Sequence, residues 1–66
     1  LAPIIINMLS DVEKVLPVGK TFICSGIVDH EKDAVVQALN AHHFTVTEVK
    51  EKNGWVAIVA IYNGCK

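Results

Sequence analysis

The hydrophobic and polar positions of this 66-residue chain predict five elements in the order α-β-α-β-β. One of them, from Lys20 to Ile27, is a nearly unbroken apolar run with a β-branched and aromatic bias, opened by Pro17 and Gly19 and closed by Ser25-Gly26. Such a run is typical of a strand that is buried on both faces in a sheet covered by helices. We therefore expect the rest of the chain to pack around this strand.

A helix is predicted before this strand. Pro3 fits its first turn, where the missing N–H costs nothing, and Pro17 ends it because the residue before a proline is pushed out of the α region. Ile4 and Ile6 fall off the main apolar face, so the stripe is wider than one small sheet requires, which predicts a covering neighbour. The main face follows the three- and four-residue spacing of a helix: Leu1, Ile5, Met8, Leu9, Val12, Val15 and Leu16.

A second helix is predicted after the strand. Asp29 is a natural N-cap, and Glu31 and Asp33 place negative charge on the first turn, where the helix dipole favours it. The helix is expected to end near His43. Its predicted buried face consists of Val35, Ala38, Leu39 and His42.

The last part of the chain is predicted to form a hairpin. Residues 44–50 alternate in part between apolar and polar, and Asn53-Gly54 is a strong signal for a type I′ turn. Residues 55–62 are apolar at every position, which indicates a strand covered on both faces. We therefore predict that this last strand lies between the first strand and the more polar strand 44–50, antiparallel to its hairpin partner.

Composition adds three limits. Sixty-six residues allow one domain, 1–66, with no separate second domain. Apolar residues make up 52% of the chain, rich for so small a globule, and the start at Leu1 without a methionine also suggests a piece of a longer protein. A net charge of −1 argues against a direct nucleic-acid partner, and no apolar run approaches the roughly 20 residues of a membrane span.

The two cysteines, Cys24 and Cys65, are unclustered, and the chain shows no secretion signal. This pattern favours reduced thiols and a cytoplasmic location. Cys24 lies inside the apolar run, where burial raises the pKa of a thiol, so we expect core packing from it rather than nucleophilic chemistry. No catalytic residue is predicted.

Ser25-Gly26 is the only place where fold logic predicts a site, because open α/β sheets bind ligands at the carboxyl ends of their strands. The histidines predict no metal centre. His42 and His43 are adjacent and point about 100° apart on a helix, and His30 lies at its other end. An interaction of the helix-end pair with the last helix carbonyls is the ordinary explanation.

Several short motifs occur together in one order: Ser25-Gly26-Ile27, a helix over 33–39 that begins Asp-Ala-Val-Val, Phe44-x-Val46-x-Glu48, and Asn-Gly-Trp-Val-Ala-Ile-Val-Ala over 53–60. This series resembles the C-terminal end of the bacterial methyltransferases that modify ribosomal large-subunit protein L-eleven, which are class I S-adenosylmethionine-dependent enzymes. The resemblance covers nearly the whole chain. It departs at His43-Phe44, where the family has Gly-Phe, so His43 would have to adopt a left-handed conformation.

The resemblance implies an α/β fold that forms the C-terminal portion of a Rossmann-like class I methyltransferase sheet, with the first strand here as the fifth of seven and the hairpin as the sixth and seventh. It implies a parent enzyme that transfers methyl groups from S-adenosylmethionine to amino groups of a ribosomal protein. The cofactor-binding residues of the family would lie before Leu1, so none is carried over and no cofactor is expected for this chain alone. Ser25 and Gly26 are the matched positions on the active edge, with an implied role in lining the substrate side.

Two other interpretations stay open from the sequence. The chain could be a small stand-alone α/β interaction module that self-associates through its open sheet edge. It could also be the tail of a different class I methyltransferase, which upstream residues would decide.

Overall fold

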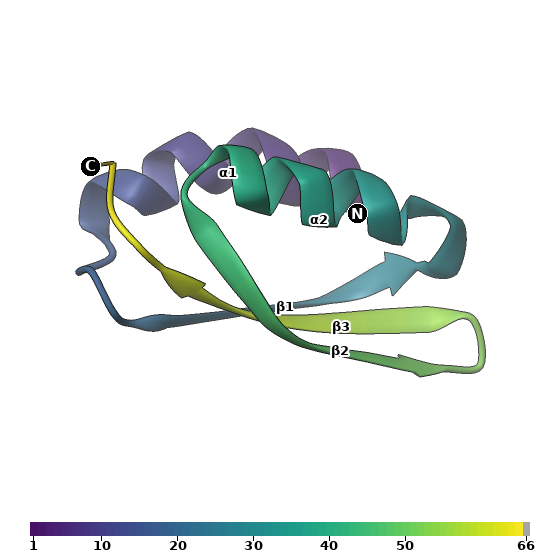
Figure 1. Cartoon of the computed structure of the whole chain (residues 1–66). Coiled ribbons are helices and arrows are strands. Elements are labelled where there is room, and N and C mark those ends of the chain that lie inside the picture. The colour runs from purple at the N-terminus through teal and green to yellow at the C-terminus, as the bar shows by residue number, and fades with distance from the viewer. Residues whose placement is uncertain (66) are drawn as a thin grey trace.

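The computed structural model describes residues 1–65 and contains five main elements and one short 3-10 turn (Figure 1). The helices are α1 (Ala2–Val15) and α2 (Lys32–Ala41), and α2 is preceded by the turn η1 (Asp29–Glu31). The strands are β1 (Thr21–Val28), β2 (Phe44–Lys52) and β3 (Trp55–Tyr62). The predicted α-β-α-β-β order is confirmed.

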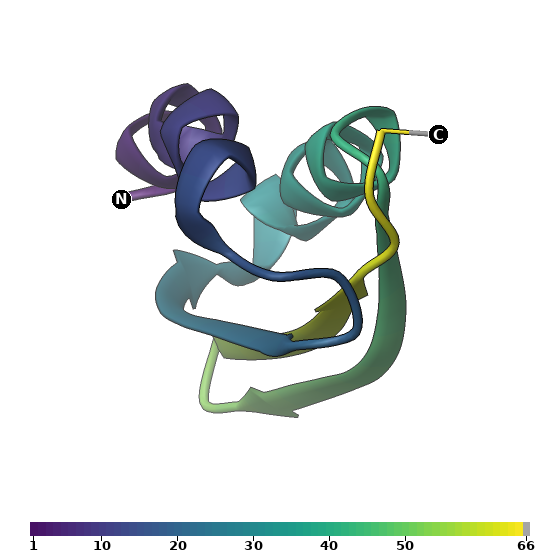
Figure 2. The same ribbon diagram turned by 90° about the vertical axis from the view of Figure 1, so that its left-hand side faces the viewer.

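The three strands form one sheet in the order β1-β3-β2, and β3 is antiparallel to both neighbours. The prediction of a central last strand is therefore confirmed. The hairpin turn is confirmed as well, since Asn53 and Gly54 have φ angles of 54° and 82°, as a type I′ turn requires. Both helices lie on the same face of this sheet, side by side, which gives a two-layer α/β arrangement (Figures 1 and 2).

The core lies between the two helices and the sheet. Phe44 packs against the rings of Phe22 and Tyr62, with ring centroids 5.6 and 5.0 Å apart. These tilted arrangements are those that aromatic quadrupoles favour. The fully buried side chains are Leu9, Ile27, Val35, Leu39, Ile58 and Val56.

The predicted burial of both sheet faces is wrong for this chain. In β3 the buried residues alternate with partly exposed ones, and in β1 the side chain of Ile23 is 66% exposed while Cys24 next to it is buried. Because α1 and α2 cover one face only, the other face of the sheet lies open (Figure 2). An apolar run therefore shows that both faces of a strand carry apolar side chains, but it does not show whether this chain contains the elements that cover both faces.

The predicted N-cap is also wrong. Asp29 begins the 3-10 turn, and its backbone N–H donates to the Gly54 carbonyl at 2.9 Å, so it is tied to the hairpin. Glu31 precedes the first residue of α2 and makes no side-chain capping bond. The interruption by η1 moves the N-cap from Asp29 to Glu31, two residues along the chain.

The predicted left-handed residue after the second helix is confirmed, since His43 has a φ of 72°. Helix α1 begins with Pro3 in its first turn and ends before Pro17, as predicted. Of its predicted face, Ile5 and Leu9 are buried, whereas Val15 is 80% exposed. Within residues 1–65 no helix is long and apolar enough to cross a membrane.

Candidate functional site

The predicted site residues Ser25 and Gly26 form a β-bulge. Cys24 pairs with Ile58 and Ile27 pairs with Val56, so these two residues of β1 lie opposite one residue of β3. Bulges of this kind bend a strand and redirect its side chains. The bulge therefore interrupts the ladder at the position where the sequence predicts a ligand-binding edge.

Gly26 occupies this bulge for two physical reasons. Its φ of 75° lies in the left-handed region, which costs residues with a Cβ about 1–2 kcal/mol. A Cβ built at this position would also lie 2.7 Å from Cδ1 of Leu1, next to the start of α1. Gly26 therefore lets the chain before α1 approach the backbone of β1.

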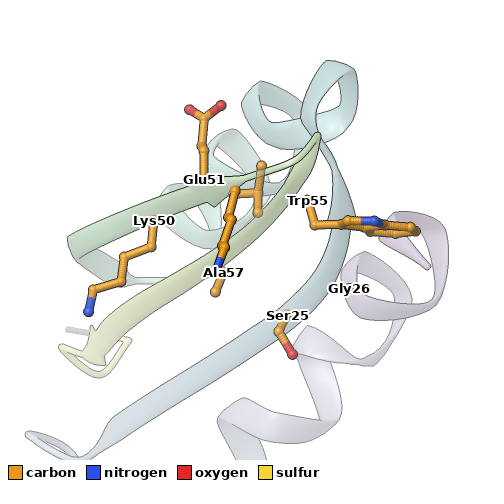
Figure 3. Close-up of a pocket in the computed structure, with 8 residues that line it drawn as sticks. Ser25, Gly26, Lys50, Glu51, Trp55 and Ala57 are labelled. Carbon is orange, nitrogen blue, oxygen red and sulfur yellow. The ribbon is translucent and has the colours of Figure 1, made fainter.

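The bulge borders a groove of about 530 Å³ on the open side of the hairpin (Figure 3). The side chains of Ser25, Lys50 and Ala57 point to the same side, and Trp55 extends beside Gly26. The groove is lined by Ser25, Gly26, Lys50, Glu51, Lys52, Trp55, Val56 and Ala57. The structure thus places both predicted site residues in one groove, together with two segments that lie far away in the sequence, 50–52 and 55–57.

Two of the charged side chains that line this groove are held in ion pairs. Glu51 points away from Lys50 in the close-up view, and its carboxylate accepts a hydrogen bond from Lys32 Nζ at 3.1 Å (Figure 3). This bond to Glu51 raises the pKa of the Lys32 ammonium. Lys50 Nζ is paired with Glu48 Oε2 at 3.4 Å, and Lys52 is the other lysine of the lining, beside an apolar floor.

The groove is equipped for binding rather than for nucleophilic chemistry. In the part of the chain that the structure describes, Ser25 Oγ has no histidine or carboxylate as a hydrogen-bond partner. A serine needs such a base to act as a nucleophile. Ser25 can donate or accept one hydrogen bond from a ligand, and Trp55, 55% exposed, can stack on one.

A second cluster of polar groups lies at the other end of the sheet, around Glu13 of α1. Its two carboxylate oxygens accept hydrogen bonds from His42 Nδ1 at 2.6 Å and from His43 Nδ1 at 3.0 Å. Tyr62 Oη donates to Glu13 at 3.1 Å, and Cys65 Sγ lies 3.7 Å from the same oxygen. The expectation that the histidines interact with helix carbonyls through their side chains is wrong, because α1 supplies a carboxylate instead.

The hydrogen bonds of this cluster change two proton affinities. Those from His42 and His43, with a smaller effect of Tyr62, lower the pKa of Glu13 from 4.5 to about 2, although partial burial opposes the change. The bond to Cys65, together with burial and the Glu13 carboxylate, raises the pKa of Tyr62. Glu13 is therefore an ionised acceptor at neutral pH.

Sequence reasoning missed this cluster because its other members lie 29 to 52 residues from Glu13 along the chain. Glu13 sits on a helix whose pattern shows only an apolar face and its polar reverse. The one local signal is His43, since a histidine in the left-handed region is uncommon and points to an unusual surrounding. Both cysteines are free thiols, and burial raises the pKa of Cys24, as predicted.

Comparison with known proteins places the chain among one group of enzymes. The family model for ribosomal protein L11 methyltransferase matches residues 1–62. Curated proteins of that name from Halalkalibacterium halodurans and Bacillus subtilis are 43% and 38% identical over 60 residues, which cover 91% of this chain and 19% of each relative. The protein of that name from Prochlorococcus marinus is 35% identical over 60 residues, 91% of this chain and 20% of the relative.

The chain thus spans about one fifth of the length of the curated relatives it matches. No solved structure matches it.

Proposed function

The chain belongs to the ribosomal protein L11 methyltransferase family, as its motifs indicate, and from this premise we propose that it acts as the C-terminal part of an S-adenosylmethionine-dependent protein methyltransferase. The parent enzyme methylates amino groups of a ribosomal protein. The chain is not active by itself and contributes one end of the sheet and one wall of the substrate site.

The sheet topology is the observation that carries this proposal. The order β1-β3-β2 leaves one edge of β1 unpaired among the described residues, and both helices cover the same face. On the open face Ile23 and Trp55 expose large apolar surfaces. In the proposed parent, further strands pair with the free edge of β1 and further helices cover this face.

The described residues do not fit S-adenosylmethionine. The methyl donor carries a positive sulfonium, and the lining of the groove beside Ser25 offers it one carboxylate, Glu51, together with the lysines Lys50 and Lys52. The carboxylate of Glu51 is turned to Lys32 instead. When bound in the parent, the cofactor supplies the methyl group, and we assign its binding to segments other than residues 1–65.

Within this proposal Ser25 and Gly26 line the substrate side. The bulge removes a side chain at Gly26 and turns the Ser25 hydroxyl to the open groove. Leu1 occupies the space beside Gly26, so a substrate polypeptide would meet the bulge on its groove side, at Ser25. The serine can orient it through one hydrogen bond.

A chimeric enzyme tests the proposal. The segment of the Bacillus subtilis relative that aligns with this chain is replaced by residues 1–62, and transfer of labelled methyl groups to ribosomal protein L11 is measured. We expect activity within about tenfold of the unaltered relative, which is about 1.4 kcal/mol in transition-state free energy. Val15→Asp on the exposed side of α1 serves as the neutral control, and Ile23→Asp should abolish soluble, active chimera because it places a charge at the proposed interior.

A folded chimera that binds S-adenosylmethionine but transfers no methyl group would overturn the proposal. In parallel, calorimetric titration of S-adenosylmethionine into the 66-residue chain is expected to show no saturable heat. Saturable binding would mean that residues 1–65 do build a cofactor site, against the charge argument above.

A second function is favoured by the same open face. An exposed, apolar sheet face with a free strand edge can pair with a second copy of the chain, as in a self-associating interaction module. Ile23 lies on this face, so both the methyltransferase proposal and the self-association alternative require it to be covered. Sedimentation of the isolated chain that stays monomeric at all concentrations would count against this alternative.

A further inference from the structure

Three potential metal ligands of different chemistry converge at the end of the sheet opposite the groove. Glu13 comes from α1, His43 follows α2, and Cys65 follows β3. One carboxylate oxygen, one imidazole nitrogen and the thiol sulfur lie within 4.8 Å of one another. Cys65 lies beyond residues 1–62 that the family model matches.

The spacing of these atoms is close to that of a zinc coordination sphere. Zinc bonds of about 2.1 Å to oxygen or nitrogen and about 2.3 Å to sulfur, in a tetrahedron, separate oxygen and nitrogen by about 3.4 Å and oxygen and sulfur by about 3.6 Å. In the structure His43 Nδ1 lies 3.0 Å and Cys65 Sγ lies 3.7 Å from Glu13 Oε1. Both distances lie within a few tenths of an ångström of these values, and all three ligand atoms lie within 4.8 Å of one another.

The backbone holds two of the three ligands in place. The N–H of Asn63 donates to the His43 carbonyl at 2.8 Å, and the Asn63 side chain donates to Thr45 Oγ1 at 2.7 Å. The next residue, Gly64, has a φ of 84°, and a Cβ there would lie 2.9 Å from Val18. The tail is therefore folded back so that the Cys65 thiol faces His43.

We propose that Glu13, His43 and Cys65 bind a single Zn²⁺ ion, with a fourth position open to water. A cavity of about 490 Å³ lined by Glu13, Tyr62 and Cys65, among others, provides access and room for that water. Three protein ligands and one open position form an established zinc arrangement.

The chemistry of the donor set favours zinc over magnesium or calcium. Thiolate and imidazole are ligands of zinc and related transition metals, whereas magnesium and calcium require oxygen donors. One carboxylate and one thiolate balance the two positive charges of the ion. On binding, the Cys65 thiol releases its proton to solvent, and the neutral His43 ring changes tautomer by exchange with solvent, so that its proton is on Nε2 and the Nδ1 lone pair is left for the metal.

Two further residues would orient the ligands. His42 Nδ1 donates to the other oxygen of Glu13 at 2.6 Å, and Tyr62 Oη lies 3.4 Å from Cys65 Sγ. Such hydrogen bonds fix ligand orientation, and their loss typically costs about 10- to 100-fold in metal affinity. His42 and Tyr62 are thus positioning residues of the proposed site.

The test is metal titration of the purified, chelator-treated chain. Zn²⁺ affinity is measured by competition with a chromophoric chelator, and Co²⁺ replaces Zn²⁺ to report a thiolate charge-transfer absorption. We expect one ion per chain, and a loss of about 100-fold or more in Cys65→Ser and in His43→Gln, because each removes a direct ligand. Cys24→Ala and His30→Ala are matched controls. Cys24 is buried in the core, and His30 lies beside Asp29 in η1, at the end of α2 opposite His43.

His42→Gln is expected to weaken binding by about tenfold while the thiolate absorption persists, as an orienting role requires. Circular dichroism of each variant checks that the fold is retained, and the exposed position of Cys65 makes Cys65→Ser the variant that folds most readily. Absence of one-to-one binding in the unaltered chain overturns the proposal. So does binding that is equally strong in Cys65→Ser, or a cobalt absorption that disappears in Cys24→Ala.

Discussion

The β-bulge at Gly26 leads to a quantitative prediction, because the chain contains a matched control. Gly26 and Gly19 both have positive φ angles, 75° and 87°. A Cβ at Gly19 would meet nothing within 4 Å, whereas one at Gly26 would meet Leu1 at 2.7 Å. Gly19→Ala thus measures the cost of the left-handed backbone alone, and Gly26→Ala adds the cost of displacing Leu1.

The backbone cost is about 1–2 kcal/mol. The Leu1 side chain is 65% exposed and can rotate away, which adds an off-rotamer cost of about 0.5–1.5 kcal/mol. Gly26→Ala should therefore lower the free energy of unfolding by about 1.5–3.5 kcal/mol. In a Leu1→Ala background its effect should fall to that of Gly19→Ala.

The assay is urea unfolding followed by far-ultraviolet circular dichroism, with the unaltered chain, the three single variants and the double variant measured at equal concentration. Gly26→Asn provides a further check, because asparagine tolerates the left-handed region better than alanine. The reasoning is refuted if Gly26→Ala leaves stability unchanged, since the bulge would then not require positive φ. It is also refuted in part if the excess over Gly19→Ala survives in the Leu1→Ala background.

Three further predictions concern the core, the acid range and the open face. Leu39→Ala, at a fully buried position, should lower the free energy of unfolding by about 2–5 kcal/mol, whereas Val15→Ala should change it by no more than about 0.5 kcal/mol. Thermal unfolding measures both, and equal effects would contradict the packing described here. The Glu13 pKa is lowered on folding, so its stabilising contribution is complete above about pH 4.5 and is lost as pH falls toward about 2. In chelator-containing buffer Glu13→Gln should therefore flatten the pH dependence of the urea midpoint in that range, and an unaltered slope would disprove the assigned hydrogen bonds. Ile23→Lys should reduce concentration-dependent association in sedimentation without lowering the urea midpoint, and undiminished association would exclude the open face as its cause.

Much of the fold follows from local features of the sequence. Apolar periodicity predicts α1 and the buried pair Val35 and Leu39 of α2, because a helix places residues three and four apart on one face. The Asn53-Gly54 turn predicts the hairpin, because only residues that accept positive φ form it. The apolar run of β3 identifies the central strand, since a central strand has neighbours on both sides.

Other features depend on how distant segments meet. No periodicity distinguishes a face that this chain covers from a face left for another part of a longer protein, so the open side of the sheet appears only in three dimensions. The bulge at Gly26 depends on the register between β1 and β3. The alternation of side chains indicates which residues of a strand share a face, but it does not show where one strand carries an extra residue.

The sequence by itself determined the family and the order of elements, because these depend on short motifs and local backbone preferences. Only the tertiary structure decided that Glu13, His43 and Cys65 meet. His43 and Cys65 lie 30 and 52 residues after Glu13 in the sequence. Their approach depends on the packing of α1 beside α2 and on the turn at Gly64. Contacts over such separations arise from the summed geometry of several elements, which no local pattern of residues encodes.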